Sequence, residues 1–420
     1  MKVVLHMSKK VKNSKGLSAK QKLLLTNMFK WCVCVAEIFV TIIMITGIVL
    51  LVMPNAKMKL LSSPFGKHFA SYIIDKDSYE ENVHDETFKK DEVETNDELD
   101  ISKFEEYTTI ALFGIDARGS EFDNITHSDS IMVVSINNKT GEIKMVSLYR
   151  DTLSRIIRNN GAVVYDKLTN AYYLGGPQAA INTINTSLDL NITDYAVINF
   201  SGLADVIDLL GGIEVNLTKK EMQYVNGYLV ETRKITGKKA PDLTQYGDNI
   251  HLTGLQAVAY CRIRYTTFYD EEGNAINNDY GRTARQRSVI KKLVDKAKAA
   301  GAEQLLSIVD IVFKGQAEEK TFATSLSYEE IIEMIPHLVN FSLIQEQGKT
   351  GFPYSLDTKT IHGGSMVIPT DLAYNVTKLH EYLYGDEDYV PTTKVQQISD
   401  TIAAISGMKK RELAEDKKNN

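Results

Sequence analysis

The amino-acid sequence predicts an α/β protein, with a central mixed β-sheet flanked by helices and preceded by one N-terminal transmembrane helix. Short apolar runs with the length of strands alternate with longer amphipathic segments typical of helices. A Gly-containing turn joins two of the strand-like runs as a hairpin. One apolar run, residues 31–53, is long enough to cross a bilayer.

The apolar run predicts an uncleaved, single-pass membrane anchor. Residues 1–30 contain eight lysines and no acid. Lysines before the run and acids after it predict a basic cytoplasmic tail at 1–30 and an extracytoplasmic location for the rest of the chain. Only one of the three cysteines lies outside the run, which fits a bacterial cell membrane better than a eukaryotic secreted protein. A cleaved signal peptide would have a shorter apolar core and a small-residue cleavage site.

Residues 54–106 are expected to form an acidic extracytoplasmic stalk. From Asp75 to Glu106 there are 14 acids and 4 lysines, and such a segment repels itself into an extended form. The net charge of −6 offers no basic field for nucleic acid. Of the three cysteines, only Cys261 lies outside the membrane run, so no disulfide framework is expected.

The catalytic domain is expected at 107–387, followed by a C-terminal tail at 388–420. Three strands are predicted at 108–116, 130–137 and 143–151, and a hairpin makes the second and third antiparallel. If the first runs parallel to the third, their ends meet the start of the second at one edge of the sheet. That edge would carry Asp116, Arg118, Asp129, Arg150 and Asp151.

A tyrosine-rich loop is expected after Lys167, followed by a helix at 177–188. Strands are expected at 194–200 and 213–217. Residues 219–253 are polar and are interpreted as a loop that covers the site. After Ala300 the pattern predicts helices at 302–313 and 327–339, and residues 366–384 are expected to close the folded part.

The stretch 258–287 concentrates arginine residues. We expect a strand in which Arg262 and Arg264 leave one face, then a helix from about Gly281 to Ala299. Arg282, Arg285 and Gln286 share a face of its first turn. Buried guanidinium groups need anionic partners. A diphosphate or an internal arginine–acid network would both serve, and the stretch alone does not favour either.

A metal ion is expected between Asp116 and Asp129. Two carboxylates without His or Cys are ligands for Mg²⁺ or Mn²⁺ and not for zinc. A binder of diphosphate alone would gain nothing from acids beside its arginines. No P-loop, GxGxxG, HExxH or CxxC pair indicates other chemistry.

Six motifs in order resemble those of the LytR-CpsA-Psr family of bacterial cell-wall proteins, over roughly residues 107–385. The most specific is Asp279, Gly281, Arg282, Arg285 and Gln286, which matches D-[FY]-G-R-x-x-R-Q. The other five contain Gly114, Asp116 and Arg118; Asp129; Arg150 and Asp151; Lys167; and Arg262 with Arg264. Two residues depart from the pattern: His127 stands for an arginine and Tyr149 for a proline.

The resemblance implies a phosphotransferase that moves a glycopolymer, such as teichoic acid or capsule, from a polyprenyl diphosphate carrier to peptidoglycan. A pyrophosphatase acting on the same carriers, and a non-catalytic envelope regulator, remain alternatives. The expected catalytic residues are Asp129, Arg150, Arg262, Arg264, Asp279 and Arg282. The expected diphosphate ligands are Arg118, Arg150, Lys167, Arg262, Arg264, Arg282, Arg285 and Gln286. A polyprenyl tail needs an apolar groove, for which the inner faces of 177–188 and 285–299 are candidates.

Overall fold

The computed structural model describes residues 63, 88–116, 126–158, 160–270, 273–316, 320–334 and 351–408. All of them belong to the compact unit Leu61–Asn420. Within these ranges, no helix combines the length and the apolar character needed to cross a membrane. The expected anchor at 31–53, the basic tail before it and Arg118 lie outside the described residues.

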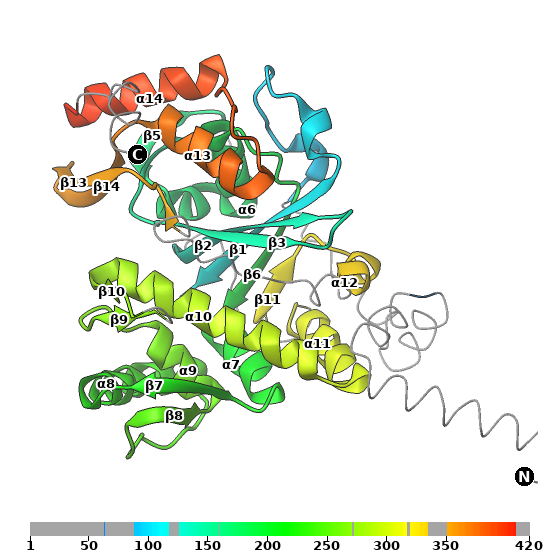
Figure 1. Ribbon diagram of the computed structural model, residues 1–420, viewed down its shortest axis with the longest axis vertical. Helices are drawn as coiled ribbons and strands as arrows, with labels where there is room; N and C mark the ends of the chain where they lie inside the picture. The colour runs from blue at the N-terminus through cyan, green and yellow to red at the C-terminus, as the bar shows by residue number, and fades with distance from the viewer. Residues whose placement is uncertain are drawn as a thin grey trace, which may run out of the picture. The chain divides into compact units, whose positions relative to one another are not determined.

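A six-stranded mixed sheet forms the centre of the domain (Figure 1), as predicted. Its strand order is β11-β6-β1-β2-β3-β12. β1 runs antiparallel to β2 and parallel to β6, and β2 runs antiparallel to β3. The ends of β1 and β3 therefore meet the start of β2 at one edge. The strands are β1 (Tyr107–Ile115), β2 (Ser128–Asn137), β3 (Ile143–Leu148), β6 (Asp194–Asn199), β11 (Phe322–Thr324) and β12 (Gly351–Phe352).

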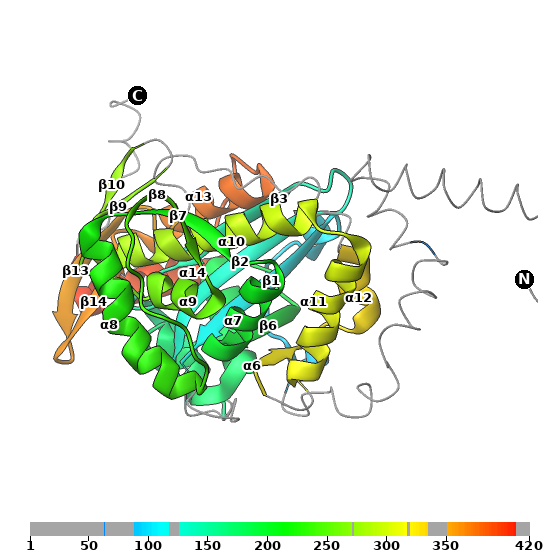
Figure 2. The same ribbon diagram turned by 90° about the horizontal axis from the view of Figure 1, so that it is seen from below.

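Helices cover both faces of this sheet (Figure 1). The upper layer contains α6 (Thr169–Leu188), α13 (Leu372–Tyr384), α14 (Thr393–Ser406) and the hairpins β4–β5 (Leu153–Ile157, Val163–Lys167) and β13–β14 (Leu356–Ile361, Gly364–Pro369). The lower layer contains α7 (Phe200–Leu209), α8 (Lys219–Thr236), α9 (Gly254–Cys261), α10 (Asn278–Ala299) and α11 (Ala302–Lys314), with β7–β8 (Ile213–Leu217, Gly247–Leu252) and β9–β10 (Phe268–Tyr269, Ala275–Ile276). From below, α7, α9 and α10 lie in front of the strands (Figure 2).

The two-residue repeat of β1 separates two environments. Ala111, Phe113 and Ile115 are at most 1% exposed and pack into the apolar core beneath α6, α13 and α14. Leu112 and Gly114 alternate with them, are only half-buried, and line a cavity on the lower face. Successive side chains of a strand point to opposite faces. The same strand therefore supports a packed core above and a hollow space below.

The predicted strand at the start of 258–287 is wrong. Residues 254–261 form helix α9, all eight of which are buried. The side chain of Gln256 accepts a hydrogen bond from the N–H of Thr253, which holds the first turn. Arg262 is the C-cap residue, so Arg262 and Arg264 leave a helix end and a loop rather than one face of a strand.

The interpretation of 219–253 as a loop is also wrong, because this segment contains α8 and β8. Thr218 and Glu221 form a capping box at the start of α8, with Glu221 N–H donating to Thr218 Oγ1 at 3.2 Å. Val225, Leu229 and Thr232 follow at helical spacing and are completely buried. The charged side chains on the opposite face of the helix account for the polar composition of the segment.

The expected helix 177–188 is the second part of α6, and the expected tyrosine-rich loop is its first part. The helix kinks at Gly175 and Gly176, where Gly176 has φ +62° and ψ −154°. Glycine adopts such values without strain. Pro177 then begins the second part, where its missing N–H costs nothing.

Both ends of the domain extend beyond the expected boundaries. Within the expected stalk, Phe104 is buried, and the Asn96 amide donates to Asp189 Oδ1 at 2.6 Å. Within the expected C-terminal tail, α14 buries Val395 and Ile398 against the upper core. The stalk is shorter than its acidity indicated, because its last part is ordered by contacts with α6 rather than by a core of its own.

His380 makes the stability of the upper layer depend on pH. It is 1% exposed, stacks on Tyr389 at 3.6 Å, and its Nε2 lies 3.0 Å from the Leu188 carbonyl. Burial lowers the pKa of His380 to about 4. The unfolded chain takes up this proton near pH 6.5, so the folded state loses stability as pH falls from 6.5 towards 4, by up to about 3 kcal/mol.

We expect urea unfolding of the full chain in mild detergent, followed by circular dichroism, to show this loss between pH 7 and pH 4.5. His380→Phe should flatten the dependence, whereas His362→Gln, at an exposed position, should leave it unchanged. An equal slope in His380→Phe and the original chain would contradict the assignment.

Candidate active site

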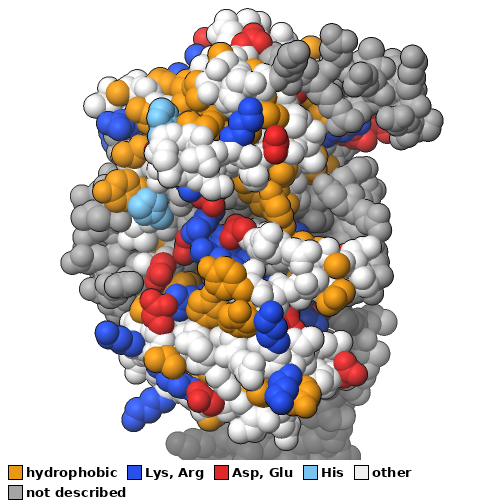
Figure 3. Space-filling model, turned by 90° about the vertical axis from the view of Figure 1, so that its left-hand side faces the viewer, with side chains coloured by type: hydrophobic (Ala, Val, Ile, Leu, Met, Phe, Trp, Pro, Cys, Tyr) orange, Lys and Arg blue, Asp and Glu red, His pale blue; other side chains and the backbone are white. Residues whose placement is uncertain are grey.

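Charged side chains from six segments gather at the sheet edge where β1 and β3 end. Figure 3 shows blue and red side chains side by side in a hollow at the centre of this face. We call this region the mouth. Its described members are Asp116, Asp129, Arg150, Asp151, Lys167, Arg264, Asp279, Arg282 and Gln286. The structure therefore brings together most of the residues predicted from the sequence.

Each cation of the mouth has a carboxylate beside it. Arg150 contacts Asp129, and Lys167 Nζ lies 3.0 Å from Asp151 Oδ1. Arg282 reaches Asp279 at 3.0 Å, and Arg264 reaches the same carboxylate at 3.7 Å. Arg282 also donates to the main-chain carbonyl of Asp129 at 3.3 Å. Arg264 and Arg282 thus share the Asp279 carboxylate, and Arg150 is paired with Asp129.

Several buried polar atoms of the mouth nevertheless have no hydrogen-bond partner among the described residues. They are Arg150 Nε, Arg282 Nε and Gln286 Oε1. The Arg282 Nε contact with Asp279 is close enough for an ion pair but not aligned as a hydrogen bond. A buried polar atom without a partner is costly, so these atoms indicate that a ligand completes the site.

Positive charge is concentrated around Arg282. Burial lowers the pKa of its guanidinium, Asp279 opposes this, and the neighbouring charges of Arg150 and Arg264 lower the pKa further. An arginine remains protonated despite such effects. A multiply charged anion held here would relieve the repulsion between the three guanidinium groups.

The first turn of α10 approaches the β9–β10 hairpin closely because of Gly281. A Cβ atom at this position would lie 2.7 Å from the carbonyl oxygen of Ile276 in β10. The helix N-terminus also supplies free N–H groups and the positive end of its dipole. The glycine of the motif is therefore required for the close contact between α10 and the β9–β10 hairpin.

Arg285 is not a diphosphate ligand in this structure. Its side chain is completely buried, and its Nη2 donates to Glu221 Oε1 at 2.7 Å and Thr266 Oγ1 at 2.6 Å. The rings of Tyr260 and Phe268 lie over the guanidinium at 5.7 and 5.5 Å. Three residues advance a helix by about 300°, so Arg285 is turned about 60° to one side of Arg282. The internal arginine–acid network is the correct interpretation for this residue.

Arg262 borders the site but is held by α8. It donates to Glu231 Oε2 at 2.7 Å and Thr232 Oγ1 at 2.9 Å. Its guanidinium also lies over the rings of Phe200 and Tyr228, at 4.9 and 5.3 Å. Both hydrogen-bond partners belong to the segment interpreted as a loop, so no pattern in the sequence pairs them with Arg262.

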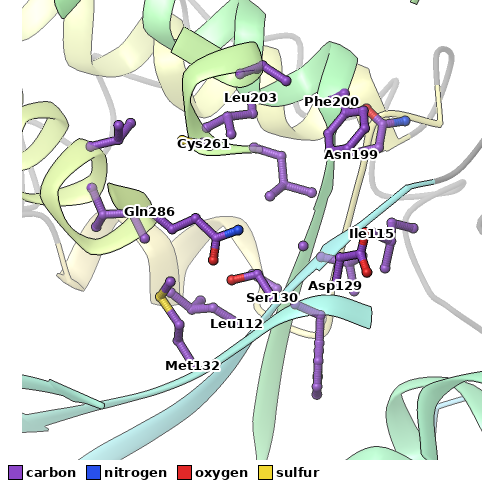
Figure 4. Close-up of a pocket in the computed structure, with 18 of the residues that line it drawn as sticks. Leu112, Ile115, Asp129, Ser130, Met132, Asn199, Phe200, Leu203, Cys261 and Gln286 are labelled. Atoms are coloured by element: carbon purple, nitrogen blue, oxygen red, sulfur yellow. The ribbon is translucent and has the colours of Figure 1, made fainter. Parts of the chain in front are cut away.

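An apolar cavity of about 610 Å³ extends from the mouth between the sheet and the lower helices. In Figure 4 the amide of Gln286 points across it towards Ser130, with Leu112 and Met132 beside them and Phe200 and Leu203 further along. Asp116, Asp129, Arg264, Arg282 and Gln286 line its polar end. Its apolar lining includes Leu112, Met132, Val197, Phe200, Leu203, Val206, Val289, Ile290, Leu293, Ile308, Val312, Leu326 and Ile331.

One of the two expected apolar grooves is present. Val289, Ile290 and Leu293 of α10 line the cavity, on the helix face that also carries Arg282 and Gln286. The helix 177–188 instead packs its Ile181 and Ile184 into the upper core. Only the lower layer therefore provides space for an apolar ligand beside the mouth, within the part of the chain that the structure describes.

The donor set of the mouth fits a hard cation that arrives with a ligand. Asp116 follows β1 and Asp129 lies at the start of β2, so the two carboxylates belong to adjacent strands and both line the cavity. Among the described residues, no group of three or more His, Cys, Asp or Glu side chains could hold a metal. Phosphate oxygens and water would have to complete an octahedral shell.

The two departures from the family pattern have structural roles. The N–H of Tyr149 donates to the Phe352 carbonyl at 3.0 Å, a bond that proline could not make. Its ring packs edge-on against Tyr280 at 4.7 Å, and burial raises the pKa of Tyr149 to about 12, so the phenol stays neutral. Arg150 still reaches Asp129. His127 stacks on Tyr173, with ring centroids 4.7 Å apart.

A model of the LytR_cpsA_psr family matches residues 71–355 of the chain. The chain is 30% identical over 252 residues to the polyisoprenyl-teichoic acid–peptidoglycan teichoic acid transferase TagU of Bacillus cereus, covering 60% of this chain and 71% of that protein. It is also 30% identical over 285 residues to biofilm regulatory protein A of Streptococcus mutans, covering 64% and 62%. A crystal structure of a Streptococcus agalactiae protein superposes with a TM-score of 0.53 at 27% identity, covering 70% and 94%.

The Arg285–Glu221 pair gives a testable prediction. Arg285→Met would leave Glu221 buried without its cation, which should lower the free energy of unfolding by about 3–5 kcal/mol. Arg233→Met removes a cation of α8 whose partner, Asp242, is exposed, and should cost about 1 kcal/mol or less. Urea unfolding compares the two variants. Equal stabilities would contradict the role assigned to Arg285.

Proposed function

Since the chain belongs to the LytR-CpsA-Psr family, we propose that it is a phosphotransferase that attaches a glycopolymer, carried on a polyprenyl diphosphate, to peptidoglycan. The observation that carries the proposal is the junction of a mouth that contains three arginines and a lysine with an apolar cavity of about 610 Å³. A polyprenyl diphosphate has a charged diphosphate, which suits the mouth, and an apolar chain, which suits the cavity. Its diphosphate would accept hydrogen bonds from Arg150 Nε and Arg282 Nε, while its first isoprene units would enter the cavity.

The reaction is a displacement at the glycan-side phosphorus. A peptidoglycan hydroxyl, by family analogy the C6 hydroxyl of muramic acid, forms a new O–P bond. The bond from this phosphorus to the bridging oxygen breaks, and polyprenyl phosphate leaves. Arg150, Arg264 and Arg282 neutralise the charge that grows on the phosphate oxygens, and such electrostatic stabilisation provides most of the rate acceleration in phosphoryl transfer.

A carboxylate of the mouth accepts the proton of the attacking hydroxyl. Asp129 and Asp279 are the two candidates. Asp129 lines the cavity itself, whereas Asp279 lies behind Arg264 and Arg282. Lys167 and, from the family pattern, Arg118 complete the diphosphate ligands. Arg262 would join them if its bond to Glu231 opened.

Asp116 and Asp129 would hold one Mg²⁺ or Mn²⁺ together with the diphosphate. When bound, the cation polarises the phosphate oxygens as a Lewis acid. Charge supports its presence: the described mouth contains the cations Arg150, Lys167, Arg264 and Arg282 and the same number of carboxylates, Asp116, Asp129, Asp151 and Asp279. A diphosphate therefore enters a mouth with no net positive charge from these residues.

The location follows from the sequence. Residues 31–53 would anchor the chain in the cell membrane, with residues 1–30 in the cytoplasm and the domain outside. The anchor would hold the domain at the leaflet from which a polyprenyl carrier presents its diphosphate. Residues 54–87 would then serve as the spacer, since residues 88–106 belong to the folded domain.

Incubation of the full chain with a polyprenyl diphosphate glycan, Mg²⁺ and peptidoglycan oligomers should give a phosphodiester-linked product, detected by mass spectrometry. Arg264→Ala should abolish both the product and the binding of the carrier without unfolding the domain, because it removes one phosphate ligand from a loop at the rim of the site. Arg233→Ala is the matched control on α8.

The other outcomes separate the alternatives. Release of free glycan phosphate without transfer would identify a pyrophosphatase. Binding of the carrier without turnover would identify a regulator, which the name of the Streptococcus mutans relative makes the second candidate. Unchanged carrier binding in Arg264→Ala would overturn the assignment of the mouth.

Calorimetry should show that Mg²⁺ binds weakly alone and at least about tenfold more tightly with a polyprenyl diphosphate present, because the ligand supplies the missing oxygens. Asp116→Asn should remove this coupling. Asp205→Asn, which pairs with Lys238 outside the mouth, should preserve it. Tight Mg²⁺ binding without the diphosphate would count against a shared site.

A further inference from the structure

Exposed tyrosine rings border the mouth on both layers of the fold. Tyr173 is 40% exposed, Tyr265 is 66% exposed and Tyr269 is 61% exposed. Tyr265 lines the opening of the cavity directly after Arg264, and Tyr269 lies in the adjoining β9–β10 hairpin. In Figure 3, hydrophobic side chains lie directly below the charged hollow. Large apolar rings are usually buried, so three exposed rings beside one site indicate a ligand surface.

The upper ring is tied to the mouth by main-chain contacts. Thr169, one turn before Tyr173, donates its hydroxyl to the Ser128 carbonyl at 2.9 Å, and its N–H donates to the Arg150 carbonyl at 2.9 Å. Ser128 separates His127 from Asp129 in the chain. Movement of the first turn of α6 would therefore move Arg150 and Asp129 with it.

These rings are held in place before any ligand binds. His127 and Tyr173 are stacked, with centroids 4.7 Å apart and ring planes 14° from parallel. Tyr265 packs against Tyr224 at 6.3 Å. A ring that is already ordered loses little conformational entropy when a ligand stacks on it. Such a pair suits recognition more than a freely rotating side chain does.

Two hairpins form the sides of the same face. In the upper layer, β13–β14 lies against the mouth: a Cβ atom on Gly364 would be 3.6 Å from Lys167 Cε, and Val367 N–H donates to the Asp151 carbonyl at 2.9 Å. In the lower layer, β9–β10 lies against α10. Figures 1 and 2 both show the two hairpins on one side of the domain. A chain-like ligand could lie between them and pass over the mouth.

The occupant follows from the chemistry of the surface. The lipid would fill the cavity and the diphosphate the mouth, so the face outside them remains for the hydroxyl-bearing acceptor. A neutral sugar ring has an apolar C–H face and a polar rim, and this matches a tyrosine, with its apolar ring and hydroxyl tip.

We propose that the His127–Tyr173 stack and Tyr265 form the acceptor subsite, which takes a glycan strand by stacking sugar rings on both sides of the mouth. This inference rests on the proposed transferase function. It assigns a role to His127, the residue that replaces an arginine of the family pattern. A ring in place of a cation favours an uncharged part of the acceptor over a phosphate.

The test titrates a peptidoglycan glycan oligomer without peptide stems into the full chain in detergent, with a short polyprenyl diphosphate present, by calorimetry. Tyr173→Ala and His127→Ala should each weaken oligomer binding about two- to tenfold, the range of one lost ring contact. Tyr173→Ala should bind the polyprenyl diphosphate as the original chain does. Tyr246 is another exposed tyrosine, which lies just before β8, and Tyr246→Ala should bind both ligands normally.

Equal oligomer affinity in Tyr173→Ala and Tyr246→Ala would overturn the proposal, and so would no oligomer binding by the original chain. A loss confined to the binding of the polyprenyl diphosphate would also overturn it, because the ring would then contact the donor. The measurement needs no turnover. A failure of transfer with ring-dependent oligomer binding would count against the proposed function alone.

Discussion

Guanidinium groups that lie against an apolar interior must have anionic partners, and this constraint organises the lower half of the domain. Arg285 meets it permanently through Glu221, which also caps α8. That single pair joins α8, α10 and the loop after α9, since Arg285 also donates to the Ile263, Thr266 and Thr267 carbonyls. The loop that carries Arg264 is positioned by an arginine that never reaches the ligand.

Arg150, Arg264 and Arg282 also have anionic partners, but a ligand can replace these partners. Their partners, Asp129 and Asp279, are partly exposed acids of the same rim. A diphosphate can replace a carboxylate on these groups because both present oxygens to the same guanidinium forks. The acids then become available for a cation or a proton. The same arginines and acids would therefore stabilise the unliganded domain and take part in the reaction when the ligand is bound.

The apolar cavity depends on the sheet as much as on the helices. The alternation along β1 places its largest side chains in the upper core. Leu112 and Gly114 lie on the lower face, where they do not fill the space between the sheet and α10. The six-stranded sheet and the packed layer above it can therefore support a cavity without losing the main core. The mouth lies at the polar end of this cavity.

The sequence by itself determined the mixed sheet, the edge where three strands bring acids and arginines together, and the first turn of α10. These features follow from the local periodicity of apolar residues and from a short hairpin, both of which depend only on residues close together in the chain. It also placed Asp129, Arg150, Asp279 and Arg282 in one site. The capping box of Thr218 and Glu221 was a readable local signal for α8, although the polar composition of 219–253 obscured it.

Only the tertiary structure decided which arginines open into the mouth and which are buried with an acid. Arg282 and Arg285 belong to one motif and one helical turn. Their side chains leave the helix about 60° apart, so Arg282 lies in the mouth and Arg285 lies in a buried ion pair. The choice depended on Glu221, 64 residues away in the chain. The capping box of Thr253 and Gln256 was a local signal for the helix at 254–261. The ordered end of the acidic segment and the docking of α14 have the same origin as the Arg285–Glu221 pair. Each is stabilised by contacts with distant segments, which no local pattern contains.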